Sequence, residues 1–244
     1  MTTMMESLIT SAAPAPPKLI VYGQPGIGKT TFAASAGAVL LDCENGAGAV
    51  RGVRRTPYLQ TWPQIRQWLA DLASAKPADV EAVAIDTIDW MITRITEHVV
   101  IDLDGKKPSD ITNTLGTAHG GYFKAREIVQ NIVHRDVLPM LNAINDQGAV
   151  IILLGHAANT KMTAPEGYDL RLAGPDLPQW IAPVFIEWAD AVLYAARDAD
   201  GRRVLVTEGT SVILAKNRYS LPAELPLSWQ SLMAAFAQTP DKGD

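Results

Sequence analysis

Residues Gly23 to Thr30 fit the phosphate-loop pattern G-x-x-x-x-G-K-[ST], directly after a short apolar run and before a helix-like run. Glycines at these positions let successive backbone N–H groups converge on phosphate oxygens. Lys29 can neutralise the β and γ oxygens, and the Thr30 hydroxyl can bind Mg²⁺. The loop therefore predicts binding of a nucleoside triphosphate, ATP, with magnesium. The residues expected to line the nucleotide are Gly23, Gln24, Pro25, Gly26, Ile27, Gly28, Lys29, Thr30 and Thr31.

Two carboxylates that follow other apolar runs could complete this site. One run ends in Asp86, which we expect to hold Mg²⁺ through water. The next residue is Thr87 rather than glutamate, so the water-activating carboxylate must come from elsewhere. Glu44, just after the run 38–41, is the candidate, because Asp42 and Glu44 alternate onto one side of a strand. A carboxylate there can deprotonate the attacking water.

The elements that must position these residues are short apolar runs separated by helix-patterned sequence, which is typical of a parallel sheet covered on both faces. Apolar residues at helical spacing predict helices over 62–75 and 122–144, with Pro139 kinking or ending the second. The strand-length runs are residues 19–22, 38–41, 80–85, 149–154 and 190–196.

The later part of the chain predicts a β-hairpin, formed by residues 203–207 and 211–215. Two long loops, about 102–121 and about 157–179, follow strands that carry candidate site residues. Loops of this length are usually functional or disordered. The expected domain layout is a flexible lead-in over 1–17, an ATPase domain over 18–226, and a short helix with a polar tail over 227–244.

Composition limits the remaining possibilities. The chain has 244 residues, 48% of them hydrophobic, which suits one well-buried core. A net charge of −5 argues against a protein that coats DNA over its whole surface. A single cysteine, Cys43, cannot build a disulfide or a thiolate metal cluster within one chain. The sequence shows no signal peptide and no membrane-length apolar run, so we expect a soluble cytoplasmic protein without membrane contacts.

Taken in order, these motifs resemble the RecA family of recombination ATPases. In that family the strand after the phosphate loop ends Asp-x-Glu with a catalytic glutamate, which here corresponds to Glu44, and the magnesium aspartate precedes a small hydroxyl residue, as Asp86 does. The resemblance gives His156 the role of sensing the γ-phosphate, where RecA proteins usually carry glutamine. It also implies that Lys216 and Arg218 reach the ATP of a neighbouring subunit.

The chain is most similar to the small phage-encoded RecA-core ATPases that assist single-strand annealing, over roughly residues 18–222. This resemblance implies a RecA-like P-loop NTPase core: a mainly parallel twisted sheet flanked by helices, with a C-terminal β-hairpin. It further implies a homo-oligomer, ring or filament, that binds single-stranded DNA in a phage or bacterial host cytosol, together with an annealing or single-strand-binding protein. The shared segments are Tyr22–Thr31, Leu41–Glu44, Ile85–Asp89, Gly155-His156 and Ala215–Pro222.

The two long loops are the candidate DNA-binding segments. Lys106, Lys107 and the aromatic segment 120–123 flank the first loop, and Lys161 and Arg171 lie in the second. Cations and aromatic side chains on loops suit single-stranded DNA, through phosphate contacts and base stacking. The alternative is that these are ordinary surface cations and a Tyr–Phe pair in the core.

Three functions fit this pattern. The first is a DNA-stimulated ATPase of RecA type. The second is a P-loop small-molecule kinase, which the position of Glu44 and the lack of an arginine-rich lid disfavour. The third is a nucleotide-dependent assembly switch that mainly recruits partners, which the acidic net charge of −5 keeps open.

Overall fold

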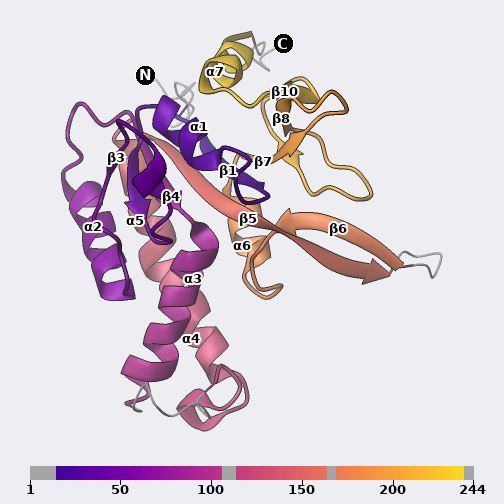
Figure 1. Ribbon diagram of the computed structural model, residues 1–244. Coiled ribbons are helices and arrows are strands. Elements are labelled where there is room, and N and C mark those ends of the chain that lie inside the picture. Colours follow the sequence, from indigo (N-terminus) through magenta and orange to yellow (C-terminus); the bar gives the residue numbers. More distant parts are fainter. Residues whose placement is uncertain (1–14, 106–113, 164–168, 239–244) are drawn as a thin grey trace, which may run out of the picture.

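The computed structural model describes residues 15–105, 114–163 and 169–238. Within these residues one ten-stranded sheet has the order β10-β8-β7-β1-β5-β4-β2-β3, with β6 pairing β5 and β9 pairing β7 (Figure 1). The strands are β1 Lys18–Gly23, β2 Val39–Asp42, β3 Arg54–Arg55, β4 Ala82–Asp86, β5 Val150–Thr163, β6 Asp169–Pro175, β7 Ala191–Arg197, β8 Arg203–Val206, β9 Lys216–Asn217 and β10 Glu224–Pro226.

The helices lie on both faces of this sheet. The α-helices are α1 Lys29–Ser35, α2 Trp62–Ser74, α3 Ile88–Glu97, α4 Lys124–Ile132, α5 Leu138–Asp146, α6 Ala182–Trp188 and α7 Trp229–Gln238. Short 3-10 segments are η1 Ala47–Ala49 and η3 Ala118–Gly120, and π-helical segments are η2 His98–Leu103 and η4 Val133–Val137. No helix in the described part of the chain is long and apolar enough to cross a membrane.

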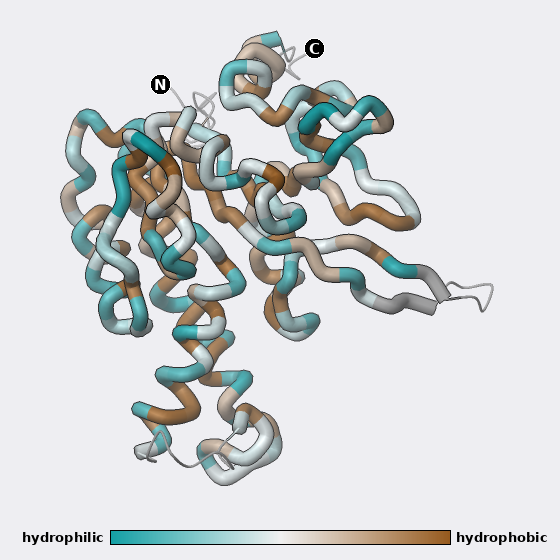
Figure 2. The backbone as a smooth tube through the Cα atoms, viewed as in Figure 1, coloured by the Kyte–Doolittle hydropathy of each residue, from teal (hydrophilic) through white to brown (hydrophobic). Residues whose placement is uncertain are grey.

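The central strands are parallel and buried. Strand β1 pairs in parallel with β5 and β7, and β4 pairs in parallel with β5 and β2. Alternate residues of β1 enter two separate cores: Leu19 and Val21 pack with α1 and α7, whereas Ile20 and Tyr22 pack with helices α2 to α6. Hydrophobic residues gather along these strands, and hydrophilic ones lie toward the outer turns (Figure 2). The predicted architecture, a mainly parallel sheet flanked by helices, is confirmed.

The C-terminal hairpin is present, but the predicted strand pairing is wrong. Strand β8 pairs antiparallel with β7 and with β10, and not with residues 211–215. The apolar run at 212–214 instead packs along β6, where Ala173 N donates to Val212 O at 2.8 Å and Leu214 N donates to Ala173 O at 2.9 Å. The Tyr22 hydroxyl also donates to Leu214 O at 2.6 Å. An apolar run can satisfy its backbone on any adjacent edge, and the nearest one in space decides.

The segment 157–179, predicted as a long loop, is largely a β-ribbon. Strand β5 continues past the sheet to Thr163 and pairs antiparallel with β6, from Ala157↔Pro175 to Thr163↔Asp169. This two-stranded ribbon projects from the body of the molecule (Figure 1). Within the ribbon the strands mix polar and apolar residues, so they form no continuous apolar run there that a search for buried strands would find. In the ribbon the two strands supply each other's main-chain hydrogen bonds.

The predicted helix over 122–144 is α4, η4 and α5 in succession. Pro139 lies in the first turn of α5, directly after the π-helical segment η4. A proline ring clashes with the carbonyl four residues earlier in a regular helix, and a π-helical turn relieves that clash. The predicted helix over 62–75 is α2, which begins with a capping box formed by Thr61 and Gln64.

Candidate nucleotide-binding site

The phosphate loop connects the end of β1 to the start of α1, and its geometry requires glycine at several positions. A Cβ on Gly23 would lie 2.4 Å from Ala195 O, so only glycine allows β7 to approach this closely. Gly26 and Gly28 have φ values of 74° and 115°, in the region that favours glycine. The motif glycines are therefore explained by backbone conformation and close packing.

Lys29 is the first residue of α1 and is buried, with 7% of its surface exposed. Its ammonium group donates hydrogen bonds to Gly23 O at 3.0 Å and to Gln24 O at 3.2 Å. Burial lowers the pKa of Lys29, and the carboxylates of Asp86 and Glu44 act in the opposite direction. The charge of Lys29 is thus held against its own loop, at the position where phosphate oxygens would compete for it.

Asp86 ends β4 and faces the first turn of α1. The Thr30 hydroxyl donates to Asp86 Oδ2 at 2.9 Å. The pKa of Asp86 is raised to about 6, mainly by burial and also by the carboxylates of Glu44 and Asp42, against the lowering effect of the Thr30 hydrogen bond and of Lys29. A hydroxyl and a buried carboxylate are oxygen ligands of the kind that Mg²⁺ prefers. Thr30 and Asp86 therefore fit the predicted magnesium site.

Strand register brings the predicted residues to one edge of the sheet. Asp42 pairs with Asp86, Asp86 pairs with Leu154, and Gly23 pairs with His156. The carboxyl ends of β1, β2, β4 and the parallel part of β5 therefore lie side by side. This is the edge at which open α/β sheets bind ligands.

Asp42 and Glu44 have different surroundings, and of these two residues only Glu44 lines the pocket. Strand β2 ends at Asp42, and Glu44 lies in the turn that follows, where Asn45 has a left-handed φ of 68°. That Asp42 and Glu44 share one side of the chain stays a prediction. Asp42 is fully buried, pairs with Arg55 Nη1 at 2.9 Å, and accepts a hydrogen bond from Asn45 N at 2.7 Å. Asp42 thus fixes the turn that carries Glu44 into the pocket.

His156 lies between two carboxylates. Its Nε2 is 3.4 Å from Glu44 Oε1, and its Nδ1 is 2.8 Å from Asp89 Oδ2. The structure therefore joins Glu44 and His156, which the sequence places more than a hundred residues apart. Asp89 ends the segment Ile85–Asp89, and no sequence pattern assigns it a role.

The resulting pocket has a volume of about 300 Å³ and contains a residue that the sequence did not single out. Arg203, at the start of β8, lies over the phosphate loop, with Nη1 3.2 Å from the position of a Cβ on Gly28. In the part of the chain that the structure describes, the guanidinium of Arg203 has no hydrogen-bonding or ion-pair partner. No sequence pattern marked it, because an arginine at a strand end is common. The lining residues are Pro25, Gly26, Gly28, Lys29, Thr30, Thr31, Glu44, Gly46, Val50, Asp86, His156 and Arg203.

Comparison with known proteins agrees with this geometry. A family described as an AAA domain matches residues 15–219 of the chain. The protein belongs to this AAA-domain family. It is accordingly a nucleotide-binding P-loop ATPase, which confirms the assignment made from the sequence at the level of the family. Membership of the phage-encoded group stays a prediction.

Solved structures with a similar course of the chain are distant from this AAA-domain protein. The RadB recombinase is 13% identical, with a TM-score of 0.49, and the match covers 94% of this chain and 95% of that one. The KaiC-like protein PH0186 from Pyrococcus horikoshii OT3 is 14% identical, with a TM-score of 0.43, and the match covers 91% and 90%. A comparison with curated proteins finds no match. The family assignment rests on the AAA-domain match.

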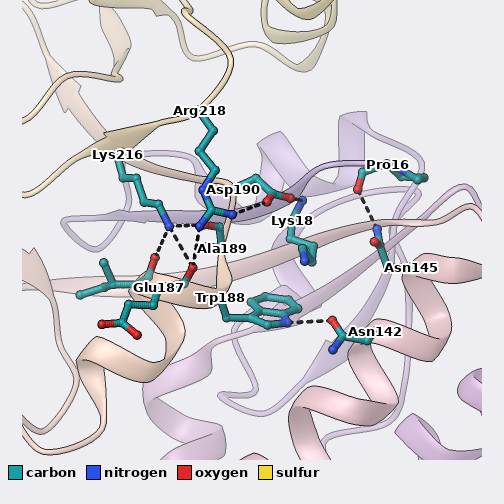
Figure 3. A network of polar contacts seen from close by, with 11 residues as sticks. Pro16, Lys18, Asn142, Asn145, Glu187, Trp188, Ala189, Asp190, Lys216 and Arg218 are labelled. Atoms are coloured by element: carbon teal, nitrogen blue, oxygen red, sulfur yellow. Dashed lines mark hydrogen bonds and ion pairs between the residues drawn. The ribbon is translucent and has the colours of Figure 1, made fainter. Parts of the chain in front are cut away.

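Lys216 and Arg218 of the AAA-domain protein lie near the amino ends of the parallel strands, whereas the pocket lies at their carboxyl ends. Strand β9 pairs with Ala191 and Val192 at the beginning of β7, the end that pairs with the start of β1. Their polar partners are shown in Figure 3: Lys216 Nζ donates to Ile186 O, Glu187 O and Ala189 O at 2.8, 3.0 and 2.6 Å, and Arg218 Nη1 is 3.1 Å from Asp190 Oδ1.

These contacts give Lys216 and Arg218 a structural role within one chain. Lys216 caps carbonyls at the end of α6, and burial, together with the Arg218 guanidinium, lowers its pKa. Asp190 also accepts a hydrogen bond from Lys18 N at 3.0 Å, which joins β1 to the same network. A contribution of these two cations to the ATP site of a neighbouring subunit stays a prediction.

The predicted DNA-binding cations are only partly described. Lys106 and Lys107 lie outside the described residues, as does the side chain of Lys161, whose backbone pairs with that of Arg171 across the ribbon. Arg171 is exposed on β6. The segment 120–123 is not a core pair, as one alternative had it, because Tyr122 is 92% exposed and Phe123 is 52% exposed.

Proposed function

We propose that this AAA-domain protein hydrolyses ATP in an oligomer, that Glu44 activates the attacking water, and that single-stranded DNA stimulates turnover. The observation that carries the catalytic part is the single pocket in which Lys29, Asp86 and Glu44 meet. A cation for the phosphates, a carboxylate for magnesium and a second carboxylate for water are the groups that phosphoryl transfer to water requires.

In this proposal each residue acts on a stated atom. Lys29 leaves a loop carbonyl and binds β and γ oxygens. Thr30 and Asp86 would hold Mg²⁺, which would neutralise charge on the phosphates. The Glu44 carboxylate accepts a proton from water as the water oxygen bonds to the γ-phosphorus. The bond from that phosphorus to the bridging oxygen then breaks, and ADP leaves with the electron pair. His156 would sense the γ-phosphate, a role supported by the 3.4 Å distance between its Nε2 and Glu44 Oε1.

The DNA part of the proposal rests on the segment from His119 to Phe123, at the end of η3 and directly before α4. Five consecutive residues, from His119 to Phe123, have positive φ values, which turns this segment outward and leaves Tyr122 exposed. The Arg126 guanidinium lies 3.9 Å from the centre of the Phe123 ring. An exposed aromatic ring beside a cation supports base stacking together with phosphate contact. Lys106, Lys107, Lys161 and Arg171 would add phosphate contacts.

The oligomer part rests on Lys216 and Arg218. Within one chain the Lys216 ammonium is engaged by carbonyls of α6, so a role at a neighbour's ATP requires that it exchange these partners on assembly. A cation supplied across a subunit interface would stabilise transition-state charge. An annealing or single-strand-binding protein is the partner that the resemblance suggests.

The test is ATP hydrolysis with and without single-stranded DNA, for wild type, Lys29→Ala, Glu44→Gln and the control Glu81→Gln. Glu81 is exposed and precedes the opposite end of β4. We expect DNA to raise turnover of wild type and control, Lys29→Ala to lose nucleotide binding, and Glu44→Gln to bind ATP without turning it over. Normal hydrolysis by Glu44→Gln would remove Glu44 from catalysis, and a rate raised by a small acceptor instead of DNA would favour a kinase.

The DNA contact has its own pair of variants. Tyr122→Ser should reduce stimulation by single-stranded DNA while basal hydrolysis stays unchanged. Trp68→Ser on α2, an exposed aromatic outside this segment, is the matched control. Equal stimulation of both variants and wild type would exclude Tyr122 from the DNA site.

A further inference from the structure

Asp89, in the first turn of α3, makes two hydrogen bonds to a single residue. Its Oδ1 accepts from the His156 backbone N at 3.1 Å, and its Oδ2 lies 2.8 Å from His156 Nδ1. The side chains of Asp89 and His156 are 14% and 20% exposed, so both contacts are largely shielded from water. Two bonds from one carboxylate fix both the main chain and the ring of His156.

The chemistry of these groups determines which ring nitrogen faces the reaction. An ionised carboxylate can only accept hydrogen bonds, so the contact with Asp89 favours the ring form in which Nδ1 of His156 keeps a proton and donates a hydrogen bond to Asp89. The other ring nitrogen, Nε2, therefore points to Glu44, 3.4 Å from Oε1. A histidine whose second nitrogen is held by a carboxylate has a fixed tautomer and a fixed ring plane.

The local sequence is suited to this contact. Helix α3 packs directly on Gly155, just before His156, since a Cβ there would be in ordinary contact, 3.4 Å from Ile88 Cγ2 and 3.9 Å from Asp89 Oδ1. On the other side, Asp176 N donates to His156 O at 2.8 Å, which holds the main chain as β5 leaves the sheet. His156 is thus fixed from α3 and from the end of β6, and only Nε2 is directed at the nucleotide pocket.

We propose that Asp89 is a positioning residue for ATP hydrolysis, which acts by holding the His156 imidazole so that Nε2 faces Glu44 and the γ-phosphate. This inference rests on the proposed function of the pocket. Asp89 itself does not line the nucleotide pocket. Its effect on turnover therefore passes through His156.

The simplest competing role for Asp89 is structural, since an acidic residue in the first turn stabilises a helix. The two roles differ in a double-mutant cycle. If Asp89 acts through His156, then Asp89→Asn should lower kcat about 10- to 100-fold in wild type, with ATP affinity unchanged within about twofold. In a His156→Gln background the same substitution should change kcat by less than about twofold, because the group it positions is gone.

A second measurement does not depend on hydrolysis. The chain contains four histidines, so the ring nitrogens of isotope-labelled histidine can be resolved by NMR in the nucleotide-free protein, and His156→Gln identifies the signals of His156. In wild type we expect a protonated Nδ1. In Asp89→Asn the amide can donate as well as accept, so the proton should redistribute between Nδ1 and Nε2. Glu97→Gln, which removes another carboxylate from α3, should leave these signals unchanged.

Two results would overturn the proposal. One is an equal loss of kcat from Asp89→Asn in the wild-type and His156→Gln backgrounds. The other is an unchanged pair of His156 ring signals in Asp89→Asn, whatever happens to the melting temperature. A wild-type protein that does not hydrolyse ATP would instead refute the proposed function, and the ring signals would still report whether Asp89 holds His156.

Discussion

Two lysines of this AAA-domain protein donate to main-chain carbonyls at opposite edges of the same sheet. Lys29 contacts two carbonyl oxygens of its own loop, and Lys216 contacts three at the end of α6. A lysine ammonium has three N–H donors. Lys216 is therefore saturated, whereas among the described residues Lys29 has acceptors for only two of its donors.

The surroundings of the two lysines also differ, because only Lys29 borders a pocket. Lys29 borders a pocket of about 300 Å³ that also contains Asp86 and Glu44. Lys216 lies beside the Arg218–Asp190 ion pair, in a network that ties β1, β9 and α6 together (Figure 3). The comparison teaches that a lysine in a sequence motif marks a ligand site only where one of its N–H groups has no protein acceptor and a pocket lies beside it. A lysine whose N–H groups are all bonded within the chain instead stabilises the fold.

The largest expected effect is the loss of ATP affinity when Lys29 in the pocket is replaced. Lys29→Ala should weaken ATP binding by about 100-fold or more, because a charge-assisted contact to phosphate is lost. The melting temperature should change little, since the carbonyls of Gly23 and Gln24 can turn to water. Titration calorimetry with ATP and Mg²⁺ measures the affinity. A large loss of stability without a loss of affinity would make Lys29 a scaffold residue like Lys216.

Asp86 should make the nucleotide-free protein less stable as the pH rises. Its pKa is raised from 3.8 to about 6 in the fold, so the native state holds this proton more tightly than the unfolded chain does. The free energy of unfolding should therefore fall between about pH 4 and pH 6, by up to about 3 kcal/mol, and the loss should persist above that range. Asp86→Asn should remove this dependence, measured by urea unfolding without nucleotide or magnesium. An identical pH profile in the variant would contradict the assignment.

Replacing Lys216, at the amino ends of the parallel strands, should change the stability of the fold and not ATP affinity. Lys216→Ala should lower the free energy of unfolding by about 2 kcal/mol, because three helix-end carbonyls lose a charged donor. ATP affinity of the single chain should stay as in wild type. Lys124→Ala, on α4, serves as the control. If Lys216→Ala keeps full stability but abolishes turnover of the oligomer, the cation works at a neighbour's ATP and the comparison of the two edges fails.

The smallest expected effect concerns Arg203, which covers the loop from β8. Arg203→Ala should weaken ATP binding about 10-fold, or about 1.4 kcal/mol, because the guanidinium is exposed and its contact with phosphate is screened by water. Arg202→Ala is the matched control, since Arg202 is the adjacent residue and pairs with Asp198 at 2.9 Å. Equal affinities of the two variants would place Arg203 outside the nucleotide site.

Sequence reasoning worked best where a local backbone requirement is visible in the residue types. Gly23 and Gly28 identify the loop because no other residue fits their backbone geometry. Asp86 could be found because an apolar strand that ends in an acidic residue is a typical companion of such a loop. It failed for residues 211–215, since an apolar run does not say which strand edge it will occupy. It missed the ribbon of β5 and β6, where the strands mix polar and apolar residues and so show no continuous apolar run.

By itself, the sequence determined the phosphate loop, the parallel α/β core and the candidate residues Lys29, Thr30, Asp86 and Glu44, because backbone conformation and burial are written in local residue types. Only the tertiary structure decided which cations belong to the pocket. It placed Arg203 over the loop, gave Lys216 to the end of α6, and joined Asp89, His156 and Glu44 in one chain of contacts. Strand register across distant segments sets such distances, and no local pattern encodes it.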